Sequence, residues 1–181
     1  VIQGGAIGAV ILLYWKDILT NAPLIKKLLL SFIPTAVVGF VLYEFIKEVF
    51  FESMMATTIV FTIVGILFIL VERYIKKGKI SMKLDVSKLT YRDALLIGVF
   101  QALAVVPGVS RAGAVLIGMM LLGYKRGESA KYSFMLSIPT ILAATAFDLI
   151  QMRDIAFASA SNSTLLLLGS IIAFMSALVG I

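Results

Sequence analysis

The fold of this chain is constrained most by three apolar runs that are separated by short charged segments. The runs cover residues 28–46, 54–71 and 132–150 and contain 19, 18 and 19 residues. A helix needs about 20 apolar residues to cross the hydrocarbon core of a bilayer. With 61% hydrophobic and 14% charged residues, the chain has more apolar surface than a water-soluble domain of its size can bury. The sequence therefore predicts an all-α integral membrane protein, a polytopic helical bundle.

Two further apolar runs lie at the ends of the chain, at residues 1–15 and 165–181. The first begins without methionine and is too short to span alone, and the second stops inside an apolar stretch. We therefore expect one membrane domain over residues 1–181 that is a fragment, with both ends of the natural protein missing. Residues 151–164 are predicted to be a polar linker, and Gly65 and Gly118 to be sites of close helix packing.

The net charge of +6 comes from basic residues in the short loops, so we predict no nucleic-acid partner. Loops 16–27, 72–93 and 125–131 hold thirteen Lys and Arg, against two in loops 44–53 and 151–164. The richer side is expected to be cytoplasmic. Loop 72–93, with seven of them, is predicted to be a solvated inside-facing loop in which attraction to lipid headgroups is secondary.

The apolar segment 94–124 has 31 residues, too many for one spanning helix and too few for two. Pro107 and Gly108 near its middle end a helix, so each arm is about 20 Å long. We predict a re-entrant helical hairpin; one long kinked helix and a loop at the membrane edge are the alternatives. Thr90 is predicted to cap the first arm, with Asp93 at the third helical position.

Arg111 is the only charged residue between Asp93 and Lys125. A charge at membrane depth costs about 3 kcal/mol or more, so it is retained for a cavity, a partner or a ligand. Gly108 and Gly113 allow close approach of a ligand to the backbone. Ser110, the guanidinium and the free N–H groups of the second arm together form an anion site. In a bilayer the expected anion is a lipid phosphate or diphosphate.

Two other interpretations of Arg111 stay open at this point. It could form a structural ion pair with Asp148, Glu44 or a residue outside this chain, or it could serve transport of another anion. Gln101 lies on the otherwise apolar first arm and is expected either to form an interhelical hydrogen bond or to contact the ligand. The chain has no cysteine and no histidine, which excludes thiolate chemistry and the commonest general base and metal ligand.

Residues 101–114, QALAVVPGVSRAGA, resemble the second signature of the undecaprenyl-diphosphate phosphatases, the bacitracin-resistance family. The similarity extends to residues 1–7, 90–94 and 132–139, so it runs along most of the chain. The resemblance implies an inverted-repeat membrane fold in which two re-entrant hairpins meet at a central pocket, and this chain would hold about half of that repeat. It also implies a multi-pass protein of a bacterial plasma membrane, for which a homodimer is a candidate assembly.

The activity implied by the resemblance is hydrolysis of undecaprenyl diphosphate to the monophosphate, the carrier lipid of cell-wall synthesis. Arg111 would bind the diphosphate and Ser110 would assist as the second catalytic residue, while Gly108, Gly113 and Gln101 would bind substrate. A divalent cation, Mg²⁺ or Ca²⁺, is expected, with its ligands in the missing N-terminal part.

The chain departs from the family pattern in two respects. The first signature, with its glutamates, serines and histidine, is absent, which we attribute to truncation. Ala112 and Val115 stand where the family usually has serine and threonine. These departures leave a lipid-phosphate transporter or flippase, and a catalytically inactive relative, as alternative functions.

Overall fold

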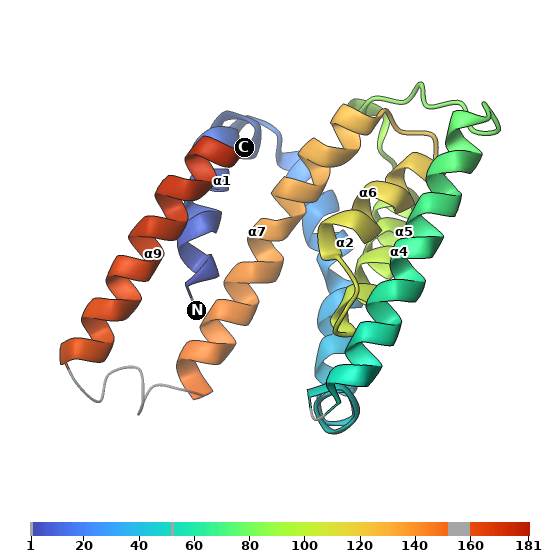
Figure 1. The fold of residues 1–181 in the computed structure, drawn as a ribbon. Helices are drawn as coiled ribbons and strands as arrows, with labels where there is room; N and C mark the ends of the chain where they lie inside the picture. Colours follow the sequence, from blue (N-terminus) through green and yellow to red (C-terminus); the bar gives the residue numbers. More distant parts are fainter. Residues whose placement is uncertain (1, 52, 152–159) are drawn as a thin grey trace. The chain divides into compact units, whose positions relative to one another are not determined.

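The structure is a computed structural model that describes residues 2–51, 53–151 and 160–181 (Figure 1). Val1, Glu52 and most of the expected linker 151–164 lie outside the described residues. The described part is helical and contains no strand, so the predicted all-α class is confirmed. It forms two compact units, one of residues 1–25 with 134–181 and the other of residues 26–133.

The first unit is held together by the packing of α1 (Gln3–Thr20) against α9 (Ala160–Gly180). A Cβ atom on Gly5 would overlap the backbone of Ser170, and one on Gly8 would lie 3.2 Å from the Phe174 ring. Small residues that let two backbones approach are typical of helix contacts in membranes. The later part of α7 (Arg126–Gln151) belongs to the same unit.

The second unit holds the hairpin and the helices around it (Figure 1). It contains most of α2 (Ala22–Val41), the short α3 (Tyr43–Ile46), α4 (Met54–Lys76), α5 (Tyr91–Ala102), α6 (Arg111–Leu121) and the start of α7. A π-helical turn, Lys47–Phe51, precedes α4. Among the described residues, α2, α4 and α7 are long and apolar enough to cross a membrane, with 20, 23 and 26 residues.

Several predicted boundaries were wrong because the helices continue into charged or polar residues. Of the expected loop 16–27, only Asn21 lies outside a helix, and it separates α1 from α2. The Asn21 side chain accepts a hydrogen bond from the Leu24 N–H at 3.1 Å, so it caps the second helix at once. α9 likewise begins at Ala160, inside the expected linker. Lysines tolerate such positions because their aliphatic stems stay on apolar surface while the ammonium reaches water.

The segment 94–124 forms two antiparallel helices rather than one kinked helix. α5 and α6 have 12 and 11 residues, about 18 and 16 Å, so neither can cross a bilayer. The predicted capping box of Thr90 and Asp93 is confirmed. The chain enters and leaves the hairpin at one place, because the N–H groups of Lys83 and Leu84 both donate to the Gly123 carbonyl at 3.0 Å. That the hairpin re-enters a membrane stays a prediction.

Glycines decide how closely the hairpin packs. A Cβ on Gly118 of α6 would lie 2.7 Å from the Phe100 ring of α5, which confirms the predicted close packing. A Cβ on Gly98 would overlap the Ser31 carbonyl of α2, so the first arm lies directly on that helix. The same prediction for Gly65 was wrong, because this glycine lies on an exposed side of α4 and a Cβ on it would have no described atom within 4 Å.

Candidate anion site at the hairpin tip

The tip of the hairpin is fixed by the conformation of Gly108. Its φ of 97° lies in the left-handed region that glycine adopts without strain. A Cβ at this position would lie 2.7 Å from the Thr57 carbonyl oxygen and 3.0 Å from the Phe61 nitrogen. The loop at the tip therefore packs directly against the backbone of the first two helical turns of α4.

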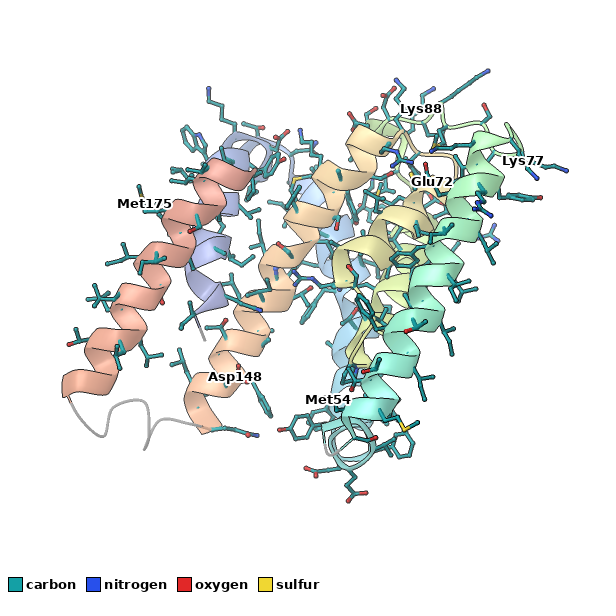
Figure 2. The ribbon with its side chains drawn as sticks, viewed as in Figure 1. Met54, Glu72, Lys77, Lys88, Asp148 and Met175 are labelled. Carbon is teal, nitrogen blue, oxygen red and sulfur yellow. The ribbon has the colours of Figure 1, made fainter. Side chains whose placement is uncertain are left out.

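The hairpin runs along most of α4. Its tip contacts Thr57, whereas its base is bonded to residues 83–84, which follow the last turn of α4. Thr57 and Lys76 are separated by about 28 Å of helix. Figure 2 shows Met54 and Lys77 at opposite ends of this helix. The tip thus lies toward the end of α4 that is remote from the basic loop.

Ser110 is the N-cap of α6, as expected for the start of the second arm. Its side-chain oxygen accepts a hydrogen bond from the Gly113 N–H at 3.2 Å, and the residue is exposed. Because the oxygen serves as acceptor there, the hydroxyl proton is available to a ligand. The N–H groups of the first helical turn, at Arg111 and Ala112, have no intrahelical partner. They point the positive end of the helix toward the same place.

Arg111 is the first residue of α6 and is half-buried. Within the described residues of its unit it forms no hydrogen bond or ion pair. Glu44 therefore does not neutralise it in this unit, and Asp148 belongs to the other unit. A half-buried guanidinium beside a helix N-terminus and a hydroxyl has the composition of a phosphate-binding site.

Close packing against α4 requires a glycine at residue 113, as it does at residue 108. A Cβ on it would overlap the Phe68 ring of α4. Both glycines thus let the second arm lie against that helix, which brings Ser110 and Arg111 into a fixed position. Whether their backbones also contact phosphate stays a prediction.

Gln101 is 1% exposed and lies in the last turn of α5. Its Nε2 donates a hydrogen bond to the Thr35 hydroxyl of α2 at 2.9 Å, so the expected interhelical hydrogen bond is confirmed. The Thr35 hydroxyl in turn lies 3.5 Å from the Gly98 carbonyl. Gln101 therefore fastens the first arm to α2 just before the tip, and contact with substrate stays a prediction.

A buried cluster that the sequence analysis missed supports the first arm. The Ser31 hydroxyl of α2 donates to the Ala94 carbonyl at 2.6 Å and lies 2.8 Å from the Tyr132 hydroxyl of α7. Ser31 and Tyr132 are both 0% exposed. The four-residue spacing of Ser31 and Thr35 puts both hydroxyls on one face of α2, and that spacing is the signal that could have revealed the contact.

The base of the hairpin is joined by a second unpredicted contact, between Asp93 and Tyr124. The Tyr124 hydroxyl donates to the Asp93 carboxylate at 2.8 Å, which links the start of α5 to the residues after α6. Burial raises the pKa of Asp93, but hydrogen bonds from Thr90 and Tyr124 outweigh it and lower the pKa below its usual value. The carboxylate is therefore held in its charged form.

The two departures from the family pattern lie in different surroundings. Ala112 is exposed beside Arg111, whereas Val115 is 1% exposed. A hydroxyl at residue 112 would be accessible at the tip. A threonine at residue 115 would place its hydroxyl inside the packed hairpin, where it needs a backbone carbonyl as partner. The exposed alanine is therefore the departure that removes a donor from the accessible surface.

The fold is that of an integral membrane protein, and its candidate anion site is the half-buried Arg111 with Ser110 at the tip of a helical hairpin. The family described as "Bacitracin resistance protein BacA" matches residues 1–181, and this chain belongs to that family. A protein of Sulfurihydrogenibium sp. (strain YO3AOP1), named "Undecaprenyl-diphosphatase", is 42% identical over 99% of this chain and 69% of its own length.

Two further proteins of the same name extend the comparison. The one of Persephonella marina is 41% identical over 99% of this chain and 69% of its own length. The one of Aquifex aeolicus is 39% identical over 98% of this chain and 68% of its own length. The resemblance found in residues 101–114 is thus confirmed over nearly the whole chain.

Proposed function

We propose that this chain belongs to an enzyme that hydrolyses undecaprenyl diphosphate to undecaprenyl phosphate and inorganic phosphate. The observation that carries the proposal is the hairpin tip, where Arg111 lies half-buried without a protein counter-charge in its unit, beside Ser110 and the start of α6. A lipid diphosphate supplies the anion that this site lacks. The name of the relatives that share 39–42% identity gives the substrate.

The residues at the tip can do the two things that phosphoryl transfer requires of a protein, which are positioning and charge stabilisation. The guanidinium of Arg111 donates two parallel hydrogen bonds to phosphate oxygens. The Ser110 hydroxyl donates a third, because its oxygen is already oriented by the Gly113 N–H. The free N–H groups of Arg111 and Ala112 add positive potential where negative charge develops in the transition state.

The site is proposed to open on the extracytoplasmic side of the bacterial plasma membrane. The tip contacts the first two turns of α4, and the seven basic residues of 72–93 follow the other end of that helix. If the basic end is cytoplasmic, the hairpin re-enters the membrane from the cytoplasm. Its tip then lies past the middle of the apolar run of α4.

A divalent cation stays part of the proposal, and we expect its ligands to lie outside the described residues. Among the described residues, no three His, Cys, Asp or Glu side chains lie together. The described residues therefore do not form a metal centre by themselves, and the roles proposed for Arg111 and Ser110 do not depend on one.

The decisive experiment measures phosphate release from undecaprenyl diphosphate by the natural full-length protein, in detergent with Mg²⁺ or Ca²⁺. Arg111→Ala is expected to lower turnover by about 10³-fold or more, since an arginine on a transferring phosphoryl group contributes that much. Arg111→Lys is expected to recover little of it, because the planar fork is lost. Arg92→Ala, which removes an exposed arginine outside the tip, is the matched control.

Two outcomes would redirect the assignment. A folded protein that moves a non-hydrolysable lipid diphosphate between leaflets but releases no phosphate would be a flippase. A folded protein that binds the lipid without turnover, and gains activity with Ala112→Ser, would be an inactive relative. The homodimer stays a prediction that gel filtration with light scattering can test.

A further inference from the structure

The surface at the end of α4 remote from the hairpin tip carries basic side chains that the proposed reaction does not use. Six exposed residues form it, and we call them the basic face: Arg73, Lys77, Lys79, Lys83, Lys88 and Arg92. Figure 2 shows Lys77 and Lys88 projecting at this end of the unit. Arg73 lies in the last turn of α4, the four lysines follow that helix, and Arg92 lies in the first turn of α5.

The acidic residues near this surface are already engaged elsewhere. Glu72 pairs with Arg126 at 2.5 Å and lies 3.8 Å from Lys76. Asp85 pairs with Lys125 at 2.7 Å. Asp93 accepts hydrogen bonds from Thr90 and Tyr124, and Glu128 accepts one from the Val86 N–H at 3.1 Å.

Within its unit, the positive charge of the basic face is therefore not neutralised by carboxylates. None of its six side chains forms an ion pair with a described residue of residues 26–133. Lys79 lies over the Tyr74 ring, 5.9 Å from its centroid, a contact that leaves the ammonium charged. After the internal ion pairs are counted, the basic face still carries positive charge that would attract an anionic partner.

The segment that carries these lysines is anchored to the rest of the unit by hydrogen bonds and buried side chains. Leu84 is paired with Tyr124, and its carbonyl accepts a hydrogen bond from the Lys125 N–H at 3.0 Å. Val86 is 9% and Leu89 3% exposed, so the segment buries apolar side chains on the unit. The segment that follows the end of α4 is consequently held against the unit by these contacts.

The neighbouring exposed side chains indicate which kind of anionic partner fits this surface. Ile69, Leu70 and Tyr74 are 56%, 53% and 52% exposed on the last turns of α4, so apolar surface adjoins the cationic surface. Tyr91 is also 52% exposed, and Lys27 lies over its ring at 5.6 Å. Tyrosines at the border of an apolar band are typical of the membrane interface. A nucleic acid would leave the adjoining apolar side chains without a partner.

We propose that the basic face binds the headgroups of anionic phospholipids in the leaflet on its side of the membrane. A phospholipid matches both parts of the surface, because its phosphate reaches the lysines while its acyl chains cover the end of α4. Basic clusters directly beyond a spanning helix attract anionic lipids through the surface potential of the leaflet. The inference is independent of the proposed phosphatase activity, since the hairpin tip lies at the other end of α4.

The test compares lipid binding of the whole protein and a fourfold variant, Lys77→Gln with Lys79→Gln, Lys83→Gln and Lys88→Gln. The apparent dissociation constant for phosphatidylglycerol is measured by native mass spectrometry, with phosphatidylcholine as the neutral reference. One lysine near a membrane surface contributes about fivefold, so the variant is expected to bind phosphatidylglycerol at least about tenfold more weakly. Phosphatidylcholine binding is expected to stay unchanged.

The matched control replaces the same four lysines by arginine, which preserves the charge and is expected to retain binding. Turnover in neutral detergent reports folding of both variants, because none of the four residues lies at the hairpin tip. Raising the salt concentration should weaken phosphatidylglycerol binding of the unsubstituted protein, which tests the charge dependence without any variant. Equal binding by both variants, binding that ignores salt, or a preference for an acidic protein or RNA over the lipid would overturn the proposal.

Discussion

Replacement of Gly108 by alanine tests whether α4 fixes the position of the anion site. The residue has a φ of 97°, which costs a residue with a Cβ about 1 to 2 kcal/mol. The added carbon would also lie 2.7 Å from the Thr57 carbonyl oxygen and 3.0 Å from the Phe61 nitrogen. Both neighbours are helical backbone and cannot rotate away, so overpacking adds about 1 to 3 kcal/mol.

The expected total is about 2 to 5 kcal/mol, which the chain can relieve by moving the tip away from α4. A shift on the order of 1 Å at a reacting group lowers turnover on the order of 100-fold. Turnover with undecaprenyl diphosphate and the thermal midpoint in detergent should therefore both fall in Gly108→Ala. Gly65→Ala is the matched control, since nothing lies within 4 Å of its new carbon, and it should leave both quantities near their original values. Full turnover and an unchanged midpoint in Gly108→Ala would refute the reasoning.

Three further perturbations address the supports of the hairpin. Tyr124→Phe removes a donor to a charged carboxylate and should cost about 1.5 to 3 kcal/mol in thermal stability; in an Asp93→Asn background the cost should be smaller, because the acceptor is then uncharged. Ser31→Ala leaves the buried Tyr132 hydroxyl without this partner and should cost about 1 to 3 kcal/mol; an unchanged melting midpoint would contradict the buried contact. Because the folded-state pKa of Asp93 is lowered, its contribution is present above the unfolded pKa of about 4 and is lost as pH falls through the folded value. Melting curves should therefore show an acid-induced loss that is smaller in Asp93→Asn.

The sequence alone predicted the features that depend on composition and local pattern. The spanning helices α2, α4 and α7 follow from apolar length, and the capping box of Thr90 and Asp93 follows from short-range spacing. The hairpin followed from a mismatch between 31 apolar residues and the thickness of a bilayer. Helix ends were predicted poorly, because a run of apolar residues ends where charge begins, whereas a helix ends where its backbone hydrogen bonds end.

The site residues were predicted, but the reason for two of them was not. Gly108 and Gly113 were interpreted as places where a ligand approaches the backbone, and the structure shows that α4 approaches them first, through Thr57 and Phe68. Those partners lie about 45 to 50 residues away in the chain, and no local pattern pairs them. The same holds for the contact of Ser31 with Tyr132, at a separation of 101 residues.

These long-range contacts bear on how the site works, because each one fixes a different part of the hairpin. The Asp93–Tyr124 bond closes its base, Gln101 fastens the first arm to α2, and Gly108 seats the tip on α4. A guanidinium that must meet a diphosphate in one orientation gains catalytic power from such support, since pre-organised donors need no rearrangement at the moment of reaction. Under the proposed function, the two glycines would contribute by positioning Arg111 and would not need to contact the substrate. Substitutions at the supports should lower turnover by displacing Arg111, without removing any group that binds phosphate.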